Sequence, residues 1–584
     1  MLFAARSATA LHRLLDVLPV FAGDERITRV FTLVPGSDFD LDALAAVERA
    51  GARTVAWATA LDGTYDLILA ASPKGPVTEL RGPLLLLPHG AGFSKSVPGE
   101  GAEGAPSGLD PGFLVRDGRA VADFHALAHP RQLARLTSLS PQAAARAAVV
   151  GDPTLERVLD SRGHRDRYRA ALGTGARRLV VLTSTWGRES LLGRRPVLPA
   201  ELALGLPHDA YQLALTLHPN ERSGAGELDL AQWLEPALGA GLVLAEPYEE
   251  WAAVLAAADA VVTDHGSTAL YAAALGCPVV GAYDGGEELI PGSPMAELLA
   301  RSPHLAPDRP FDGLPAALGA CEPETVREVA DSAFAGQGRV LRRLRTEAYV
   351  LLGLRTPPGA AEPRTLPAPR TPGRAPAAFA VRVRLRAEGG AGGGTRIAVE
   401  RFPAGTDASA AHHLAAEQGT AGERHAQTAA LLYRRRAPYG ADSPHQAAWT
   451  AAGWTAHALE TYPACRTAAV VLSDRMCVVR AHSGALLTVH VEPDRTTDGR
   501  VVRADPAAAL SAVHGWLSAA SPAPPEPPAE FTCDVGGIAF RTVVRAATDD
   551  EADSSVQGPP DSVQWAPAAD PGGTGGTGGT GGTV

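Results

Sequence analysis

Residues 258–280 read ADAVVTDHGSTALYAAALGCPVV, and they predict a strand, a polar turn, a helix and a second strand. The apolar run Ala260–Val262 precedes the turn Thr263–Thr268, and a helix-forming run follows. Gly276 suits the left-handed residue that ends many helices, and Pro278 blocks further extension of the helix. The hydroxyls and backbone N–H groups of the turn would lie at the positive end of a helix dipole, which makes the turn a candidate phosphate-binding site.

The composition indicates an intracellular enzyme of several domains. The chain of 584 residues is too long for one domain. A net charge of −11 argues against a general nucleic-acid binder, because no basic excess offsets a phosphate backbone. The 5 cysteines have no metal-ligand spacing and suit a reducing compartment. No apolar run reaches the roughly 18 residues of a membrane span, so we expect a cytoplasmic protein that makes at most peripheral contact with the inner membrane face.

Two stretches alternate short apolar strands with amphipathic helices, a pattern typical of α/β folds with parallel sheets covered on both faces. In residues 1–150 the expected strands are Leu2–Ala4, Val30–Val34, Thr54–Trp57, Leu67–Ala70 and Pro83–Leu87. In residues 151–353 they are Arg178–Thr183, Gln212–Leu217, Gly241–Ala245 and the two of the opening stretch. We therefore expect two Rossmann-like lobes with a cleft between them; the family resemblance described below implies that the second lobe holds a nucleotide donor.

The remainder of the chain predicts a linker, a smaller domain and a tail. Residues 354–377 are rich in proline, which favours an extended linker rather than a packed segment. Residues 378–547 mix strand and helix patterns, including a long helix over Ala408–Arg434, and we expect a small α+β domain of unknown role. Residues 548–584 turn acidic and end in Gly-Gly-Thr repeats, so we expect a disordered tail.

Polar turns follow three of the expected parallel strands, at the carboxyl ends where open α/β sheets bind ligands. The first is Pro88–Lys95, the second is His218-Pro219-Asn220, and the third is the turn of the opening stretch. A single histidine at a strand end is more often structural than catalytic. Three such turns at equivalent places in two sheets indicate a functional site.

These turns resemble motifs of the CDP-glycerol:poly(glycerophosphate) glycerophosphotransferases, which have a GT-B glycosyltransferase-like fold. The family's His-Gly turn matches His89-Gly90, and its His-Pro-Asn turn matches His218-Pro219-Asn220. Its Ala-Asp-x-Leu-Ile-Thr-Asp-Tyr-Ser-Ser-type turn matches Ala258–Ser267, with His265-Gly266 in place of Tyr-Ser. The resemblance is good over residues 80–290 and does not extend to the last third of the chain.

The resemblance implies catalytic roles for two histidines. His89 would be the general base on the acceptor hydroxyl, since an imidazole accepts a proton near neutral pH. His218 would contact the donor's pyrophosphate or stabilise the leaving group. Each also has a structural interpretation, because His89 can cap its turn and His218 precedes a proline that ends a strand.

The resemblance also implies a donor site without metal or other cofactor. Ser267 and Thr268 would hold the donor phosphate while Thr263 and Asp264 shape their turn. Ser267 can equally act as a helix N-cap. The complete set of donor-binding candidates is Gly90, Asn220, Thr263, Asp264, Ser267, Thr268, Glu246 and Arg188. Asp38-Phe39-Asp40 imitates a metal-binding motif but lies just before an expected helix, where capping is the simpler interpretation.

The function that these features favour is transfer of a phospho-polyol or a sugar from a nucleotide diphosphate donor to a hydroxyl acceptor, such as a wall polymer or its lipid-linked precursor. One alternative is a UDP-sugar glycosyltransferase or an enzyme similar to UDP-N-acetylglucosamine 2-epimerase. Another is a non-catalytic nucleotide-binding relative, which the replacements at Ala91 and Gly266 motivate.

Overall fold

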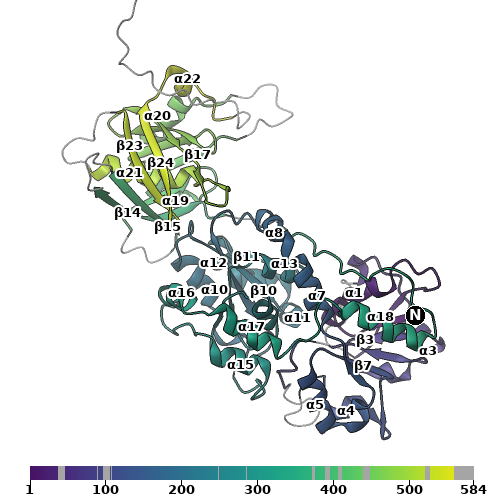
Figure 1. Cartoon of the computed structure of the whole chain (residues 1–584). Coiled ribbons are helices and arrows are strands. Elements are labelled where there is room, and N and C mark those ends of the chain that lie inside the picture. The colour runs from purple at the N-terminus through teal and green to yellow at the C-terminus, as the bar shows by residue number, and fades with distance from the viewer. Residues whose placement is uncertain are drawn as a thin grey trace, which may run out of the picture. The chain divides into compact units, whose positions relative to one another are not determined.

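A computed structural model describes residues 1–36, 47–88, 90–96, 106, 108–247, 249–284, 286–370, 375–387, 395–405, 411–437, 447–519 and 527–557. The chain forms two compact units (Figure 1). Unit 1 comprises Met1–Leu206 and Tyr211–Ala375, and unit 2 comprises Pro207–Ala210 and Pro376–Val584. Unit 1 contains the polar turns on which the functional expectations rest.

The first lobe of unit 1 is a parallel sheet in the order β2-β1-β3-β4-β7-β8. Alternate residues of its strands face different cores: Phe3 and Ala5 face one, and Leu2 and Ala4 face the other. Burial on both faces is what makes these strands continuous apolar runs. The strands are β1 (Leu2–Ala5), β2 (Val30–Leu33), β3 (Ile68–Ala70), β4 (Leu84–Leu86), β7 (Phe124–Leu127) and β8 (Ala147–Val149).

The second lobe is a parallel sheet in the order β11-β10-β9-β12-β13. Leu179 and Val181 of its central strand face one core, while Val180 and Leu182 face another. Its strands are β9 (Arg178–Ser184), β10 (Tyr211–Leu217), β11 (Val243–Leu244), β12 (Ala260–Thr263) and β13 (Val279–Gly281). The mixed α/β architecture with parallel sheets that the sequence predicts is therefore confirmed.

Helices cover both sheets. In the first lobe they include α1 (Ala8–Asp16), α3 (Trp57–Asp62), α4 (Pro111–Leu114), α5 (Pro130–Leu139) and α6 (Pro141–Ala144). The second lobe includes α7 (Pro153–Asp160), α8 (Arg165–Ala171), α9 (Leu191–Arg194), α10 (Leu198–Gly205), α11 (Pro219–Ala225), α12 (Glu227–Gly239), α13 (Glu250–Ala257), α14 (Thr268–Ala274), α15 (Pro294–Arg301), α16 (Pro310–Gly319) and α17 (Pro323–Asp331).

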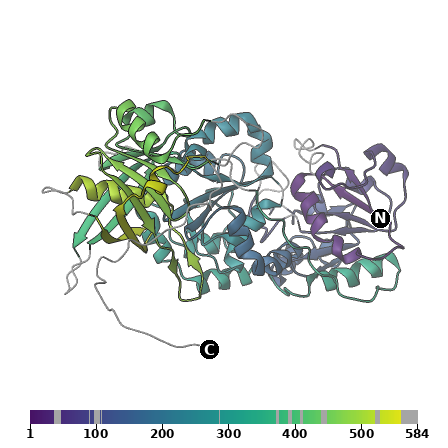
Figure 2. The ribbon, with the colours of Figure 1, turned by 90° about the horizontal axis from the view of Figure 1, so that it is seen from above.

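The last helix of unit 1, α18 (Val340–Leu352), returns to the first lobe (Figures 1 and 2). Val340, Leu344 and Tyr349 pack into the same core as Phe3 of β1. The segment after α18 has no helix or strand up to residue 370, as expected for a linker, but it is packed. Leu366 is buried, its backbone N–H donates to Ser161 Oγ and its carbonyl accepts from the Tyr168 hydroxyl.

Unit 2 is a closed barrel whose described strands run in the order β14-β15-β23-β24-β20-β19-β18-β17-β16. The helix α21 (Pro506–Ala519) is buried along most of its length and shares a core with the barrel. The strands are β14 (Ala378–Ala387), β15 (Thr395–Pro403), β16 (His413–Glu417), β17 (Leu431–Arg435), β18 (Thr467–Val471), β19 (Met476–Ala481), β20 (Leu486–Val491), β23 (Ala529–Val535) and β24 (Ile538–Ala546). The sequence predicts strands and helices here but not their closure into a barrel.

A buried arginine ties the short insert Pro207–Ala210 into unit 2. Arg401 on β15 is 1% exposed and donates to both carboxylate oxygens of Asp209, at 2.8 and 2.6 Å. Its Nη2 also donates to Asp505 at 2.9 Å, and its guanidinium lies over the Phe379 ring. Such a charge is stable in the interior only because carboxylates and hydrogen bonds compensate it.

Some elements differ from the sequence prediction. The helix expected over Ala408–Arg434 is wrong, because His413–Glu417 and Leu431–Arg435 are strands around the short helix α19 (Glu423–Thr428). Trp57 begins α3 rather than ending a strand. Part of the expected tail folds, since Glu551 in α22 (Asp549–Ala552) is buried and pairs with Arg545. Residues 558–584 and Asp38-Phe39-Asp40 lie outside the described residues. Within the described chain, no helix is long and apolar enough to cross a membrane.

Candidate functional site

A cavity of about 350 Å³ lies where the carboxyl ends of the two parallel sheets of unit 1 meet. The first lobe lines it with residues that follow β1, β3 and β4, and the second with residues that end or follow β9, β10, β11 and β12. In each sheet the chain moves first to one side of a central strand and then to the other, at β1/β3 and at β9/β12. Both of these switch points, where open α/β sheets bind ligands, therefore open onto one cavity.

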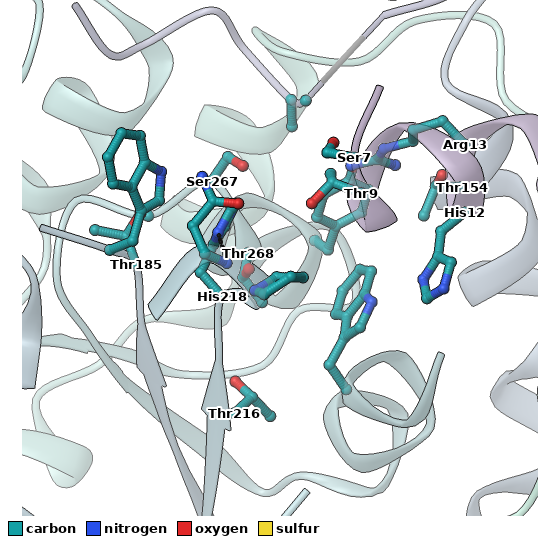
Figure 3. A pocket seen from close by; sticks show the side chains of 18 of the residues that line it. Ser7, Thr9, His12, Arg13, Thr154, Thr185, Thr216, His218, Ser267 and Thr268 are labelled. Atoms are coloured by element: carbon teal, nitrogen blue, oxygen red, sulfur yellow. Dashed lines mark hydrogen bonds between the residues drawn. The ribbon is translucent and has the colours of Figure 1, made fainter. Parts of the chain in front are cut away.

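The two lobes contribute different kinds of wall. The turn wall is formed by short segments of the second lobe: 184–186, 217–220, 245–246 and 265–268. The cation wall is formed by long side chains of the first lobe: Arg6, Arg13, Lys74 and Lys95. Figure 3 shows Ser7 and Thr9 of α1 on one side of the cavity, with Ser267, Thr268 and His218 on the other.

Asp264 lies beneath the turn wall and holds its segments together through hydrogen bonds. Its side chain is buried and does not line the cavity. One carboxylate oxygen accepts from the backbone N–H groups of Thr185 and Leu191 at 2.8 and 2.7 Å, and the other accepts from Gly266 at 2.7 Å. Burial raises the pKa of Asp264, while these N–H groups favour its charged form. This carboxylate joins the end of β9 to the turn after β12, the shaping role that the family resemblance implies.

Thr263 is also fully buried beneath the turn. Its hydroxyl lies 2.7 Å from that of Thr183 on the neighbouring strand β9. Thr263 therefore supports the turn and does not reach the cavity.

His218 lies at the mouth of the turn wall as the N-cap of α11. Its Nδ1 accepts from the backbone N–H of Asn220 at 3.1 Å. A neutral imidazole that accepts through Nδ1 carries its proton on Nε2, so His218 has the tautomer of a hydrogen-bond donor at Nε2. Both His218 and Asn220 line the cavity. The structural and the functional interpretations of His218 are thus compatible.

Ser267 and Thr268 line the cavity opposite the first lobe. The side chain of Ser267 makes no capping hydrogen bond to α14, although its position allows the N-cap interpretation. A Cβ placed on Gly90 would lie 3.6 Å from Ser267 Oγ, so the His-Gly turn of the first lobe reaches this hydroxyl. His89 lies outside the described residues, and its role as base stays a prediction.

Gly266 marks the departure from the family motif. A Cβ at this position would meet Asp264 Oδ1 at 2.9 Å and Thr185 Cβ at 3.2 Å. The site therefore excludes the serine that the family has here unless the Asp264 carboxylate moves. His265, the other departure, is buried beside Tyr283 and Glu288 rather than projecting freely into the cavity.

The floor of the cavity is a network of buried charges that sequence reasoning missed. Arg157 donates to Asp16 at 2.8 Å and to Glu249 at 2.5 Å. Burial disfavours ionisation of Glu249, but Arg157 and Arg364 outweigh it and lower the pKa of that carboxyl. Burial also lowers the pKa of His12 to about 4, so this cavity-lining imidazole is neutral at pH 7. The sequence did offer one indication of these residues. The helix α1 directly follows β1, so its first turns lie at the carboxyl end of a strand, where ligands bind.

A second part of the floor joins α14, the helix that follows the turn 263–268, to the first lobe. The Tyr271 hydroxyl on α14 donates to Asp152 at 3.0 Å. The Arg13 guanidinium lies 5.4 Å from the centre of the Tyr271 ring and 3.8 Å from Asp152. Arg13 of α1 is therefore in contact with α14 through Tyr271.

Two remaining donor-binding candidates differ in outcome. Glu246 lines the cavity, with Arg370 3.7 Å from its carboxylate. Arg188 is exposed and does not line the cavity, so the structure does not bring this donor-binding candidate into the site. Trp186 is the last cavity-lining residue of its segment, and Lys95 of the first lobe lies beside it. Among the described residues, no group of three His, Cys, Asp or Glu side chains is placed to hold a metal ion.

Comparison with known proteins gives structural likenesses alone. No protein-family model and no curated protein sequence matches the chain. A structure of the wall teichoic acid polymerase TagF superposes with a TM-score of 0.43 at 14% identity, over 60% of this chain and 88% of that one. UDP-GlcNAc 2-epimerase from Neisseria meningitidis, bound to UDP-GlcNAc, gives 0.40 at 11% identity, over 60% and 99%. S. aureus MnaA with UDP gives 0.40 at 10%, over 63% and 99%. At these identities and TM-scores the likeness fixes neither the family nor the function of this chain.

Proposed function

We propose that this chain is a transferase of the GT-B type that takes a nucleotide diphosphate donor and passes a phospho-polyol or a sugar to a hydroxyl acceptor. The observation that carries the proposal is that the switch points of both parallel sheets open onto one cavity. The turn wall supplies hydroxyls and backbone groups there, and the cation wall supplies positive charges. This pairing suits a substrate that combines a nucleoside with a charged diphosphate.

In the proposed reaction the second lobe binds the donor. Ser267 and Thr268 hold phosphate oxygens, Asp264 fixes their turn, and Nε2–H of His218 donates to the leaving group as its charge develops. Glu246, further along the turn wall, is a candidate for the ribose. These assignments extend the resemblance at His218-Pro219-Asn220 and Ala258–Ser267 to a physical role for each group.

The acceptor would enter from the first lobe. His89, or another base in its turn, would remove the proton of the acceptor hydroxyl. In phosphoryl transfer the acceptor oxygen bonds to the donor's β-phosphorus and the bond to the nucleoside monophosphate breaks. In glycosyl transfer it bonds to the anomeric carbon and the nucleoside diphosphate leaves. A lipid-linked or wall-polymer acceptor, a cytoplasmic location and peripheral membrane contact remain proposals.

Product analysis tests the function directly. The full chain is incubated with CDP-glycerol, CDP-ribitol or UDP-sugars in the presence of hydroxyl acceptors, and the released nucleotide is identified. Release of CMP supports the phospho-polyol reaction, and release of UDP supports glycosyl transfer. An altered UDP-sugar without released UDP would favour the epimerase-like alternative. Nucleotide binding without turnover would favour the non-catalytic one, and no binding at millimolar concentration would remove all of these proposals.

The exclusion of a side chain at Gly266 favours keeping glycosyl transfer as the second candidate. The glycerophosphotransferase motif has a hydroxyl at that place, whereas this chain has a glycine, and a side chain there would require the Asp264 carboxylate to move. Transfer of a group other than glycerol phosphate would not need the hydroxyl that the motif has at this position.

A further inference from the structure

Lys95 of the cation wall is held by a carboxylate that comes from the second lobe. Its Nζ lies 2.5 Å from Glu288 Oε2 and 3.3 Å from the Trp186 carbonyl oxygen. The same ammonium lies 4.7 Å from the centre of the Trp186 ring, and the centres of the Trp186 and His218 rings lie 6.3 Å apart. Lys95 and His218 both line the cavity. An ammonium has three N–H donors, so among the residues that the structure describes Lys95 has one donor beyond these two contacts for a ligand.

Glu288 in turn is held by the buried His265. His265 Nε2 lies 3.2 Å from the same oxygen of Glu288, and its Nδ1 lies 3.1 Å from the Tyr283 hydroxyl. The ionised carboxylate of Glu288 can only accept a hydrogen bond, so His265 Nε2 is the donor to it. In a neutral imidazole, Nδ1 then accepts from the Tyr283 hydroxyl.

The backbone fixes this arrangement independently of the side chains. Lys95 forms a β-bridge with Leu289, and the backbone N–H of Ser96 donates to the Glu288 carbonyl at 3.0 Å. The backbone N–H of Ile290 donates to Ser94 at 2.9 Å. Loss of the ion pair alone would therefore leave Lys95 and Glu288 close together.

We propose that Lys95 is the cation that binds the donor's diphosphate, and that Glu288, held by His265, is the counter-anion that the diphosphate displaces. This deepens the proposed function and rests on it for the identity of the ligand. Glu288 neutralises the ammonium and keeps it against Trp186. When a diphosphate enters, Lys95 exchanges Glu288 for phosphate oxygens, and Glu288 retains the His265 hydrogen bond. His265 is thus a positioning residue that acts through Glu288.

The proposal predicts that neutralising Glu288 and neutralising Lys95 change anion affinity in opposite directions, which a merely structural ion pair does not predict. Glu288 competes with the incoming anion for Lys95, so removing its charge should strengthen anion binding. Removing the charge of Lys95 should weaken it. If the pair served only to hold the lobes, the two neutralising substitutions would act in the same direction.

The test measures binding of inorganic pyrophosphate, UDP and CDP to the full chain by calorimetry. Lys95→Met is expected to weaken each by at least about tenfold, the scale of one lost hydrogen bond between charged groups. Lys95→Arg should restore part of the affinity. Glu288→Gln is expected to tighten binding about two- to fivefold. The control is Arg131→Gln, which removes an exposed ion pair between the lobes, Arg131–Glu297 at 3.2 Å, outside the cavity, and should change no affinity.

The outcomes separate the two proposals. Unchanged affinity in Lys95→Met, or weaker binding in Glu288→Gln, overturns the role of this pair and leaves the proposed function standing. Pyrophosphate binding that needs Lys95, without any affinity for UDP or CDP, removes the proposed function and keeps Lys95 as an anion-binding residue. If Lys95→Met does not fold, the proposal is still tested by two affinities. Glu288→Gln must bind the anions more tightly, and Lys95→Arg must bind them with an affinity that differs from wild type.

His265 is tested through rescue. His265→Phe removes its hydrogen bond to Glu288 and should change KM for the donor more than kcat, whereas His265→Gln, which can still donate to the carboxylate, should restore the wild-type KM. Equal effects of the two substitutions would show that His265 does not act through Glu288.

Discussion

The turn wall and the cation wall face the same cavity but are built on different principles. The turn wall presents short segments whose backbone is fixed by buried groups, above all Asp264 and the capping His218. The cation wall presents long side chains on α1 and on the loops after β3 and β4. The comparison teaches that the turn wall supplies fixed backbone geometry and the cation wall supplies charge. Substitutions in the turn wall should therefore lower stability as well as binding, whereas substitutions of the partly exposed cations should lower binding alone.

Asp264→Ala should have the largest effect and should break the turn wall as a unit. It leaves the backbone N–H groups of Thr185, Leu191 and Gly266 without their acceptor in a buried site. We expect a loss of about 3 kcal/mol in the free energy of unfolding together with loss of nucleotide binding, measured by chemical denaturation and titration. Asp284→Ala, which removes an exposed carboxylate nearby, should leave both unchanged. Wild-type stability of the Asp264 variant would show that the turn does not depend on it.

Gly266→Ser tests whether the turn wall tolerates the residue of the family motif. The added Cβ would lie 2.9 Å from Asp264 Oδ1, so we expect a destabilisation of about 1–3 kcal/mol and reduced turnover. Gly224→Ser is the matched control, because nothing lies within 4 Å of its Cβ. A gain in glycerol phosphate transfer with normal stability would contradict this prediction and favour the family's own cargo.

Substitution of Lys74 or Arg6, the two partly exposed cations of this wall outside the Arg13 and Lys95 networks, should change affinity without changing stability. Lys74→Gln and Arg6→Gln are each expected to weaken binding of an anionic donor about three- to tenfold, with the free energy of unfolding within about 0.5 kcal/mol of wild type. The effect should shrink as ionic strength rises, because partly exposed charges are screened. Titrations at low and high salt check this. An equal loss at both salt concentrations would mean that these residues shape the wall rather than supply charge.

A pH dependence of opposite sign is expected from His12 in the floor and from Asp264 beneath the turn wall. Burial lowers the pKa of His12 to about 4, below its ordinary value of about 6.5. The unfolded chain then binds more protons in this window, so the stability from His12 is full above about pH 6.5 and is lost as the pH falls toward 4. Asp264, whose pKa is raised, contributes in the opposite direction, since stability rises as the pH falls through its folded value.

Denaturation of wild type and His12→Gln at pH 7, 5.5 and 4.5 measures the first of these contributions. The difference between the two proteins should shift in favour of the variant as the pH falls. A difference independent of pH would show that His12 is not buried as a neutral group.

The sequence predicts the parallel sheets well because their strands are short apolar runs, buried on both faces, that polar turns terminate. It does not predict the barrel of unit 2, whose closure depends on partners distant in sequence, such as Ile397 of β15 beside Cys533 of β23. The alanine-rich stretch 408–434 favours a helix by local propensity, but pairing of β16 with β17 and of β17 with β18 overrides it.

The same distinction holds for the site. His218, Asn220, Ser267 and Thr268 were identifiable because each follows a recognisable strand. Arg13 and His12 were missed because they lie inside a helix, where periodicity indicates only a buried face. Lys95 lies in a turn that the sequence singles out, but its contact with Glu288 joins loops nearly two hundred positions apart. The role of His89 stays a prediction.

Unit 2 is not a continuous piece of the chain. It incorporates Pro207–Ala210, where Asp209 neutralises Arg401 inside the barrel's wall. A fragment that begins at Pro376 would thus expose an arginine that has lost one of its carboxylate partners, and we expect it to refold poorly unless a peptide spanning 207–210 is supplied. A boundary drawn at a single position would therefore not separate the barrel from unit 1, because a segment between α10 and β10 completes the barrel's charge pairing.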